Sequence, residues 1–288
     1  MGEQFGSVLA ALAAAGLRCV LFKGAAVGPL FYPHPALRPS GDVDLLVGRA
    51  DLPAARAVVE GMGFAQVVAE GPSRLSHLHA VAYRKPGSPE LDLHAFALAE
   101  DPGPDADAGF FARAVFFESA WGKAATLCAA DHLLCACVHG LRFGDPPSLH
   151  WMADAVMIVR RAGGPAFWET LVAEARRRRL SLWAARALAL IRAAFDAPVP
   201  EGVFEALLQD RPGSLRRLEL SARMRPPTMT RGLFLHWCGL ARERPDLSAI
   251  HRLSRFPRYL AEMWELDRVG QVPRAALRKS ARRLRSSA

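Results

Sequence analysis

Two aspartates separated by a single residue begin the apolar stretch DVDLLV at residues 42–47. In a β-strand the side chains at positions i and i+2 point to the same face, so Asp42 and Asp44 would project together. Two carboxylates this close repel each other unless a positive charge lies between them. A divalent cation relieves that repulsion, and oxygen ligands favour Mg²⁺ or Mn²⁺. The spacing therefore indicates a metal site.

A third carboxylate is expected from a neighbouring strand, and Asp92 in the stretch PELDLHAF has a suitable setting. Glu90, Asp92 and His94 alternate with leucines, so the three polar side chains share one strand face. An acid in an otherwise apolar strand is costly if it is buried unpaired, which favours a metal or an arginine partner. We predict that Asp42, Asp44 and Asp92 bind the metal. The alternative is that Asp42 caps a turn and Asp92 pairs with a surface arginine.

Lys23 and Gly24 follow the apolar run RCVLF and begin a short helical pattern. A lysine beside a glycine at a helix N-terminus favours phosphate, because the backbone N–H groups, the helix dipole and the ammonium act together. The loop that leads into the aspartate pair reads Arg38-Pro-Ser40-Gly41. Lys23, Gly24, Arg38, Ser40 and Gly41 are therefore the candidates for binding phosphate. Arg38 could instead pair with a carboxylate.

Four further polar residues have two interpretations each or a supporting role. His94 would lie beside the metal and help to orient its ligands. His77 and His79 fall on the first strand of an expected hairpin, where they could orient a substrate or occupy ordinary strand positions. Asp154, in the helical half, could reach the cleft or pair with an arginine.

The elements that must position these residues form a small α/β unit. A helix pattern over residues 4–15 ends at a glycine, and strands are expected at 18–22 and 42–47. Two alternating segments joined by the turn KPGSP predict a β-hairpin. We therefore expect about four strands, followed by an acidic loop, GPDADAG.

From about residue 127 onward the pattern is helical. Successive amphipathic stretches, broken by proline and glycine, predict an all-helical second half. His132, Cys135 and His139 share one face of its first helix and could bind zinc, although hydrogen bonding in the core is the favoured interpretation. The chain is thus expected to be an α+β protein with a mixed sheet. Its domains would be 1–125, a helical domain at 126–267, and a basic tail at 268–288.

Charge differs between the two halves. Residues 1–150 carry 11 basic and 15 acidic side chains, a net charge of −4, whereas residues 151–288 carry 26 and 13, a net charge of +13. The positive half is either an arginine-rich solvated surface or a surface for a nucleotide or nucleic acid. The tail has seven basic residues and no acid, so it is either a solvated terminal helix or an anion-binding arm.

Length and composition limit the class of protein. At 288 residues, with 51% hydrophobic and 23% charged residues, the chain can form two globular domains. No apolar run reaches the roughly 18 to 20 residues that cross a bilayer, and the first residues lack a basic leader, so a cytoplasmic location without a membrane partner is expected. Five cysteines without CxxC spacing argue against a disulfide framework.

The segment LFKGAAVGPLFYPHPALRPSGDVDLLV (21–47), with a later Asp-Leu-His strand, resembles the uncharacterised nucleotidyltransferase-like proteins of the DNA polymerase beta superfamily. The stretch DHLLCACVHGLR (131–142) is similar to the helical half of that family, and the resemblance covers roughly residues 17–200. It implies that the first domain is of the nucleotidyltransferase type. One departure is the sequence Lys-Gly-Ala from Lys23, where most members of the superfamily have Gly-Ser or Gly-Gly.

The resemblance implies a metal-dependent enzyme. Asp42 and Asp44 would bridge two Mg²⁺ or Mn²⁺ ions, and Asp92 would complete the site and help to deprotonate an acceptor hydroxyl. The reaction would move a nucleoside monophosphate from a nucleoside triphosphate, with ATP the expected donor, to a hydroxyl or phosphate. The acceptor could be a peptide, a protein, an RNA end or a small molecule. Two alternatives are a phosphotransferase with the same site and a nucleotide- or RNA-binding module that has lost catalysis.

Overall fold

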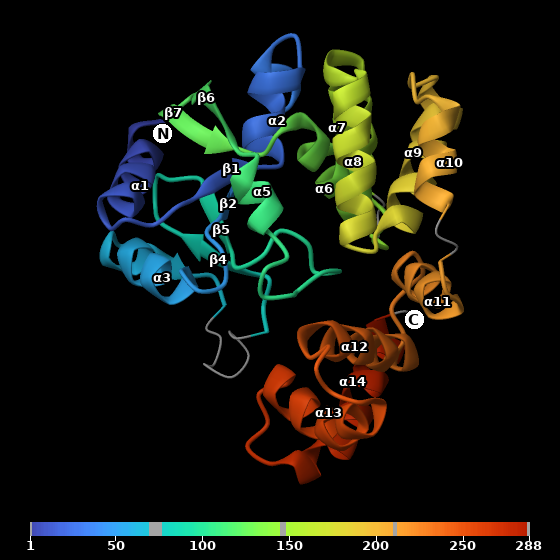
Figure 1. The fold of residues 1–288 in the computed structure, drawn as a ribbon. Coiled ribbons are helices and arrows are strands. Elements are labelled where there is room, and N and C mark those ends of the chain that lie inside the picture. The colour runs from blue at the N-terminus through green and yellow to red at the C-terminus, as the bar shows by residue number, and fades with distance from the viewer. Residues whose placement is uncertain (1, 69–76, 145–147, 210–211, 287–288) are drawn as a thin grey trace.

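The computed structural model describes residues 2–68, 77–144, 148–209 and 212–286 of the chain. A mixed seven-stranded sheet occupies the N-terminal half and helices follow it, so the α+β prediction is confirmed. Figure 1 shows helices on both sides of the sheet, and the last helices, α11 to α14, below the rest of the protein.

The order of the strands places β2 at the centre of the sheet. That order is β3-β4-β5-β2-β1-β7-β6. β2 pairs in parallel with β5 and β1 pairs in parallel with β7, while the other neighbouring strands are antiparallel. The strands are β1 (Val20–Phe22), β2 (Asp42–Leu46), β3 (Ala65–Gln66), β4 (Ala80–Arg84), β5 (Glu90–His94), β6 (Val115–Ser119) and β7 (Gly122–Thr126).

Both faces of the central strands are covered by helices. Leu45 packs in one cluster with side chains of α1 and α3, whereas Phe22 and Leu46 pack with α2 and α6 on the opposite face. Asp44 and Leu46 are two residues apart on β2, so their side chains point to the same face of the sheet, the one covered by α2 and α6. The helices named here are α1 (Gly2–Ala14), α2 (Gly24–Phe31), α3 (Leu52–Gly61) and α6 (Ala129–Gly140).

The core on the α2 side continues without a break into the helical half. α6 packs against α7, α8 and α9, and their buried side chains form one cluster with those of β1 and α2. Trp183, the largest fully buried side chain, lies in this cluster. The helices that complete it are α7 (His150–Ala162), α8 (Pro165–Arg177), α9 (Ser181–Phe195), α10 (Glu201–Leu208) and α11 (Ser214–Arg223).

The last three helices have a small core of their own. It includes Leu240 and Tyr259. His77 joins these helices to the first half, because its Nδ1 lies 2.9 Å from a Glu243 carboxylate oxygen and its Nε2 lies 3.3 Å from one of Glu262. Most of the basic tail is helical. The helices are α12 (Met229–Glu243), α13 (Ala249–Met263) and α14 (Val272–Ser286).

The hairpin of β4 and β5 is present as predicted, but the sheet has seven strands where about four were expected. The missed strands include β6, whose Val115 and Phe116 side chains are exposed and give no alternation of buried and exposed residues. His77 and His79 were expected on the hairpin, yet β4 begins at Ala80, so both lie in the segment before it.

The acidic segment GPDADAG is a turn, as its sequence predicted, and part of it is buried. It leads into α5 (Ala108–Ala112). Asp107 within it is buried, and its carboxylate accepts hydrogen bonds from Arg178 Nη2 and from the Ala97 N–H, both at 2.9 Å. An ion pair thus replaces the solvation that an exposed loop would have provided.

All five cysteines are free thiols. Within the described ranges, no helix combines the length and apolar character needed to cross a membrane.

Candidate active site

The parallel pairing of β2 with β5 brings the acids of two distant segments side by side. Asp44 lies opposite Asp92, and Asp42 lies opposite Glu90. Asp42 is exposed at the start of β2, Asp92 is half-buried, and Asp44 is 2% exposed. The three aspartates singled out in the sequence therefore lie on two adjacent strands, with Asp42 at the exposed start of β2 and Asp44 and Asp92 in the middle of their strands.

Asp44 is held by two nitrogen groups. Its Oδ1 lies 2.5 Å from Lys23 Nζ and 2.8 Å from His94 Nε2. Burial raises the pKa of this carboxyl, but the hydrogen bond from His94 and the Lys23 ammonium outweigh burial and lower the pKa to about 2. Asp44 is consequently ionised at neutral pH, and it has its own counter-charge.

His94 is neutral in this environment. Burial lowers its pKa below the ordinary range even though the Asp44 carboxylate opposes that shift. A neutral imidazole that faces a carboxylate through Nε2 carries its proton there, so Nε2–H donates to Asp44. Nδ1 is buried and has no hydrogen-bond partner among the described residues. The ring packs edge-on against Phe22, with centroids 4.8 Å apart, and against His79 at 5.5 Å.

The surroundings of Asp92 disfavour its negative charge. Burial raises its pKa, the charge of Asp44 raises it further, and the result is a pKa of about 6. The sequence suggested repulsion between Asp42 and Asp44, but in the structure the stronger repulsion is between Asp44 and Asp92, which lie opposite each other on β2 and β5. A cation between these strands would relieve it.

The donor atoms suit a divalent cation. One ligand atom each from Asp44, Asp92 and His94 lies within 4.8 Å of the others. Two carboxylates and an imidazole are a ligand set for Mn²⁺, and two carboxylates suit Mg²⁺ with water completing its shell. His94, considered in the sequence only as a residue beside the metal, is part of this group, whereas the exposed Asp42 is not.

Lys23 and Gly24 lie where β1 ends and α2 begins. Lys23 has a φ of 53° and ψ of −141°, a backbone conformation that a residue with a side chain rarely adopts. This strained position directs its ammonium to Asp44. Gly24 is required by close approach, because a Cβ there would overlap Ser40 Oγ and lie 3.3 Å from Arg38 Nη1. The N-terminus of α2 and the loop before β2 are therefore in contact.

The loop before β2 is tied to the helical half through Arg38. Its Nε and Nη2 donate to the two carboxylate oxygens of Asp154 in α7, at 2.7 and 3.0 Å. Tyr32 donates to the same carboxylate at 2.8 Å. Arg38 therefore has the carboxylate pairing that the sequence left as one of two alternatives, and Asp154 pairs with an arginine. Tyr32 was not anticipated, and no local sequence signal marks it.

Ser40 and Gly41 complete the loop. Ser40 Oγ lies 2.9 Å from the Asp42 carbonyl oxygen and 3.1 Å from its Oδ1, so the hydroxyl holds the start of β2. Gly41 is exposed, and a Cβ there would meet nothing within 4 Å. In this structure Ser40 thus faces Asp42, and Gly41 borders open space.

The remaining histidines divide between site and core. His79 is half-buried beside His94, and burial lowers its pKa to about 3. His132 lies 2.8 Å from Thr126 Oγ1 in the buried core, which is the hydrogen-bonding role favoured over zinc. Among the described residues, Asp44, Asp92 and His94 form the metal-suited group found, and Cys135 is not part of it.

The comparison with known protein families agrees with this geometry. A mixed sheet with acids on two adjacent strands, next to the N-terminus of a helix, is the arrangement that the resemblance to nucleotidyltransferases implied. Residues 1–196 match the family described as uncharacterised nucleotidyltransferase, and the chain belongs to that family. Comparison with curated proteins gives no match.

Proposed function

We propose that the protein transfers a nucleoside monophosphate from a nucleoside triphosphate, with ATP the expected donor, to a hydroxyl or phosphate of an acceptor. The observation that carries the proposal is the register of β2 and β5. It sets Asp44 opposite Asp92, beside the start of α2, in a chain of a nucleotidyltransferase family. The acceptor class stays open between a peptide, a protein, an RNA end and a small molecule.

In this proposal Asp44 and Asp92 hold Mg²⁺ or Mn²⁺, with Asp42 at the exposed end of β2 as a further carboxylate. When bound, such an ion would neutralise charge on the phosphates and on the leaving pyrophosphate. His94 keeps the Asp44 carboxylate in place through the Nε2–H hydrogen bond. Because Asp44 is already ionised at neutral pH, no proton needs to be removed from it before a cation binds.

The triphosphate would lie at the start of α2. Backbone N–H groups at this helix N-terminus favour anions, and the Lys23 side chain, which is 25% exposed, would direct its ammonium to a phosphate oxygen. Arg38 Nη1 lies beside the same helix start, next to Gly24. In the nucleotide complex, Lys23 would exchange its contact with Asp44 for one with a phosphate oxygen.

Asp92 is the candidate base. Its carboxylate would accept the proton through the oxygen that does not hold the cation. The acceptor oxygen would attack the α-phosphorus while its proton moves to a carboxylate oxygen of Asp92. The bond from the α-phosphorus to the bridging oxygen breaks, and pyrophosphate leaves with that oxygen.

The test is incubation of the protein with Mg²⁺, each of the four triphosphates labelled at the α- or γ-position, and candidate acceptors from each class. Nucleotidyl transfer is expected to place the α-label on the acceptor and the γ-label in pyrophosphate. Release of nucleoside diphosphate with a γ-labelled acceptor would show phosphotransfer instead. An Asp44→Asn variant is the control for a contaminating enzyme.

A further inference from the structure

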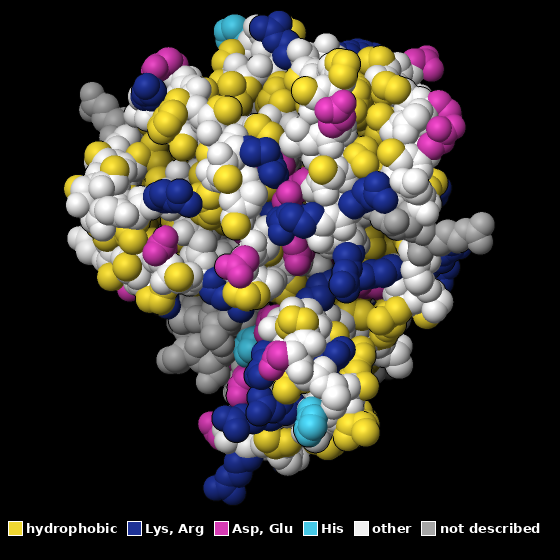
Figure 2. Space-filling view, in the orientation of Figure 1, with side chains coloured by type: hydrophobic (Ala, Val, Ile, Leu, Met, Phe, Trp, Pro, Cys, Tyr) yellow, Lys and Arg dark blue, Asp and Glu magenta, His cyan; other side chains and the backbone are white. Residues whose placement is uncertain are grey.

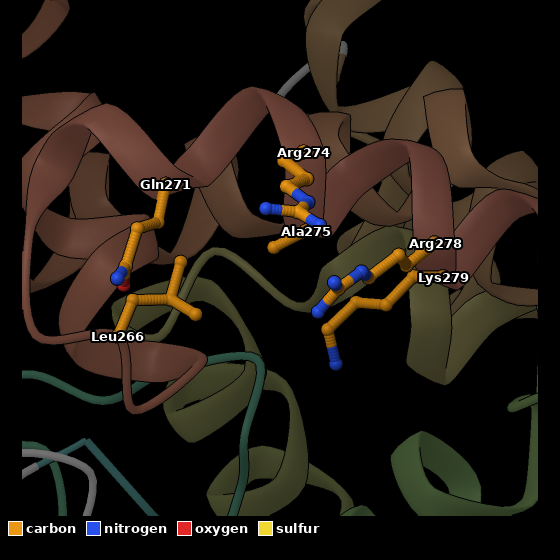
Figure 3. Close-up of a pocket in the computed structure, with 6 residues that line it drawn as sticks. All are labelled: Leu266, Gln271, Arg274, Ala275, Arg278 and Lys279. Atoms are coloured by element: carbon orange, nitrogen blue, oxygen red, sulfur yellow. The ribbon is translucent and has the colours of Figure 1, made fainter.

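The basic C-terminal helix borders a recess that the proposed transferase site does not use. The recess has a volume of about 320 Å³ and lies between α14 and the segment that follows α13. Figure 3 shows Arg274 and Arg278 of α14 with their charged ends toward the space that Leu266 and Gln271 border on the other side. Lys279 completes the lining cations.

A second recess adjoins the first. It has a volume of about 380 Å³, and its lining includes His236 of α12, Trp264 at the end of α13, and Lys279, which also lines the first recess. The His236 and Trp264 rings have centroids 6.2 Å apart and an interplanar angle of 75°. The Lys279 ammonium lies 5.5 Å from the centre of the Trp264 ring. The first recess is therefore lined by cations and the second by aromatic rings, and Lys279 lines both.

The charge around these recesses favours an anion. Three cations and no acid line the first recess, and the lining of the second includes one acid, Glu265, beside Lys279. The half of the chain that contains it, residues 151–288, has a net charge of +13. Figure 2 shows Lys and Arg side chains over much of this face of the molecule, including the lower part where the last helices lie, with Asp and Glu side chains among them. Cations at positions i and i+4 of one helix, here Arg274 and Arg278, are spaced to contact neighbouring oxygens of one anion or of adjacent phosphates.

We propose that these two recesses bind a single-stranded oligonucleotide. Its phosphates would lie against Arg274, Arg278 and Lys279, and a base would enter the second recess and stack on Trp264. Alternation of a cationic groove with an aromatic platform is the usual arrangement for single strands, whose bases are free to leave the stack. A flat anionic membrane has no group that would enter an aromatic-lined recess, and a base pair in a duplex keeps its faces covered.

The first test measures binding of the full-length protein to a fluorescein-labelled 12-nucleotide single strand by anisotropy, in RNA and DNA versions. No triphosphate is added, so the outcome does not depend on the transferase proposal. The variant Arg274→Gln/Arg278→Gln/Lys279→Gln should bind at least about tenfold more weakly at 0.1 M salt, with a shallower dependence of affinity on salt. The control Lys123→Gln/Arg161→Gln/Arg186→Gln removes three exposed charges elsewhere and should bind like wild type.

A second pair of variants tests stacking. Trp264→Leu should weaken single-strand binding by about fivefold or more, whereas Trp264→Phe should retain most of it, since a base can still stack on phenylalanine. Thermal melts of both variants separate this effect from loss of folding. A preference for the RNA or the DNA strand identifies the natural source of the oligonucleotide.

Three outcomes would overturn the proposal. The first is that the two triple variants bind the single strand with equal affinity. The second is that the protein binds the single strand and a duplex of the same sequence with equal affinity. The third is that the protein binds phosphatidylserine vesicles and neither strand.

Discussion

Replacing Asp92 by asparagine should stabilise the metal-free protein. Asparagine has nearly the same shape but cannot carry the negative charge that meets Asp44 across the two strands. Because the folded protein raises the pKa of Asp92 from its ordinary 3.8 to about 6, ionising this carboxyl opposes folding.

The size of the effect follows from the pKa. A rise of about two pKa units corresponds to about 3 kcal/mol at a pH well above 6. Asp92 is only half-buried, so solvent screening reduces the expected gain to about 1 to 2 kcal/mol, or a rise of a few degrees in Tm. The raised pKa also fixes the pH window. Wild type loses this stability as the pH rises from about 4 to above 6, so the variant and wild type should melt alike at pH 4 and differ at pH 8.

The assay is thermal unfolding at both pH values in EDTA and then in Mg²⁺. The matched control is Glu90→Gln on the same face of β5, which breaks only an exposed pair with Arg84 and should cost less than about 1 kcal/mol. Mg²⁺ should raise the Tm of wild type but not that of Asp92→Asn, because a bound cation stabilises only a protein that can bind it. An Asp92→Asn protein that melts at or below the wild-type Tm at pH 8 would refute the reasoning.

Asp44→Asn should do the opposite and lower the unfolding free energy at pH 7 by about 2 to 3 kcal/mol. The reason is that the pKa of Asp44 is about 2 and its charge is paired with Lys23. A Tm in EDTA at or above that of wild type would contradict this. Asp154→Asn leaves the Arg38 guanidinium without its carboxylate, so the unfolding free energy measured by chemical denaturation should fall by about 2 to 4 kcal/mol. The KM for the triphosphate should rise. An unchanged KM would exclude Arg38 from the nucleotide site. His77→Gln should remove part of the pH dependence of stability. Burial lowers the pKa of His77, but its hydrogen bonds with two glutamates prevail and raise it, so wild type loses stability as the pH rises from about 6.5 upward; identical pH profiles would remove His77 from the contact.

The central strands could be predicted because their local signals agree with their environment. DVDLLV is apolar after its second aspartate and becomes the middle strand of the sheet, and the turn KPGSP joins two alternating segments into a hairpin. β6 and β7 were missed for the opposite reason. The valine and phenylalanines of β6 have high β propensity but do not alternate with polar residues, and the glycine, lysine and alanines of β7 have low β propensity.

In the site, the sequence indicated the residue types but not their partners. Lys23 was notable as one of only four lysines in an arginine-rich chain, and its contact with Asp44 depends on the antiparallel register that sets Phe22 opposite Asp44. The hydrogen bond from His94 to the same carboxylate depends on the parallel register of β2 with β5. Both registers join segments far apart in the chain, and no local pattern specifies them.

Cation binding tests the central claim most directly, and it needs no knowledge of the acceptor. Mn²⁺ binding can be followed by electron paramagnetic resonance, with a non-hydrolysable ATP analogue present, for wild type, Asp44→Asn, Asp92→Asn and the control Glu90→Gln. Wild type and the control should bind Mn²⁺ alike, and each aspartate variant should bind at least about tenfold more weakly, because a carboxylate ligand has lost its charge. Equal Mn²⁺ affinity in all four proteins would contradict the assignment of Asp44 and Asp92 to a metal site.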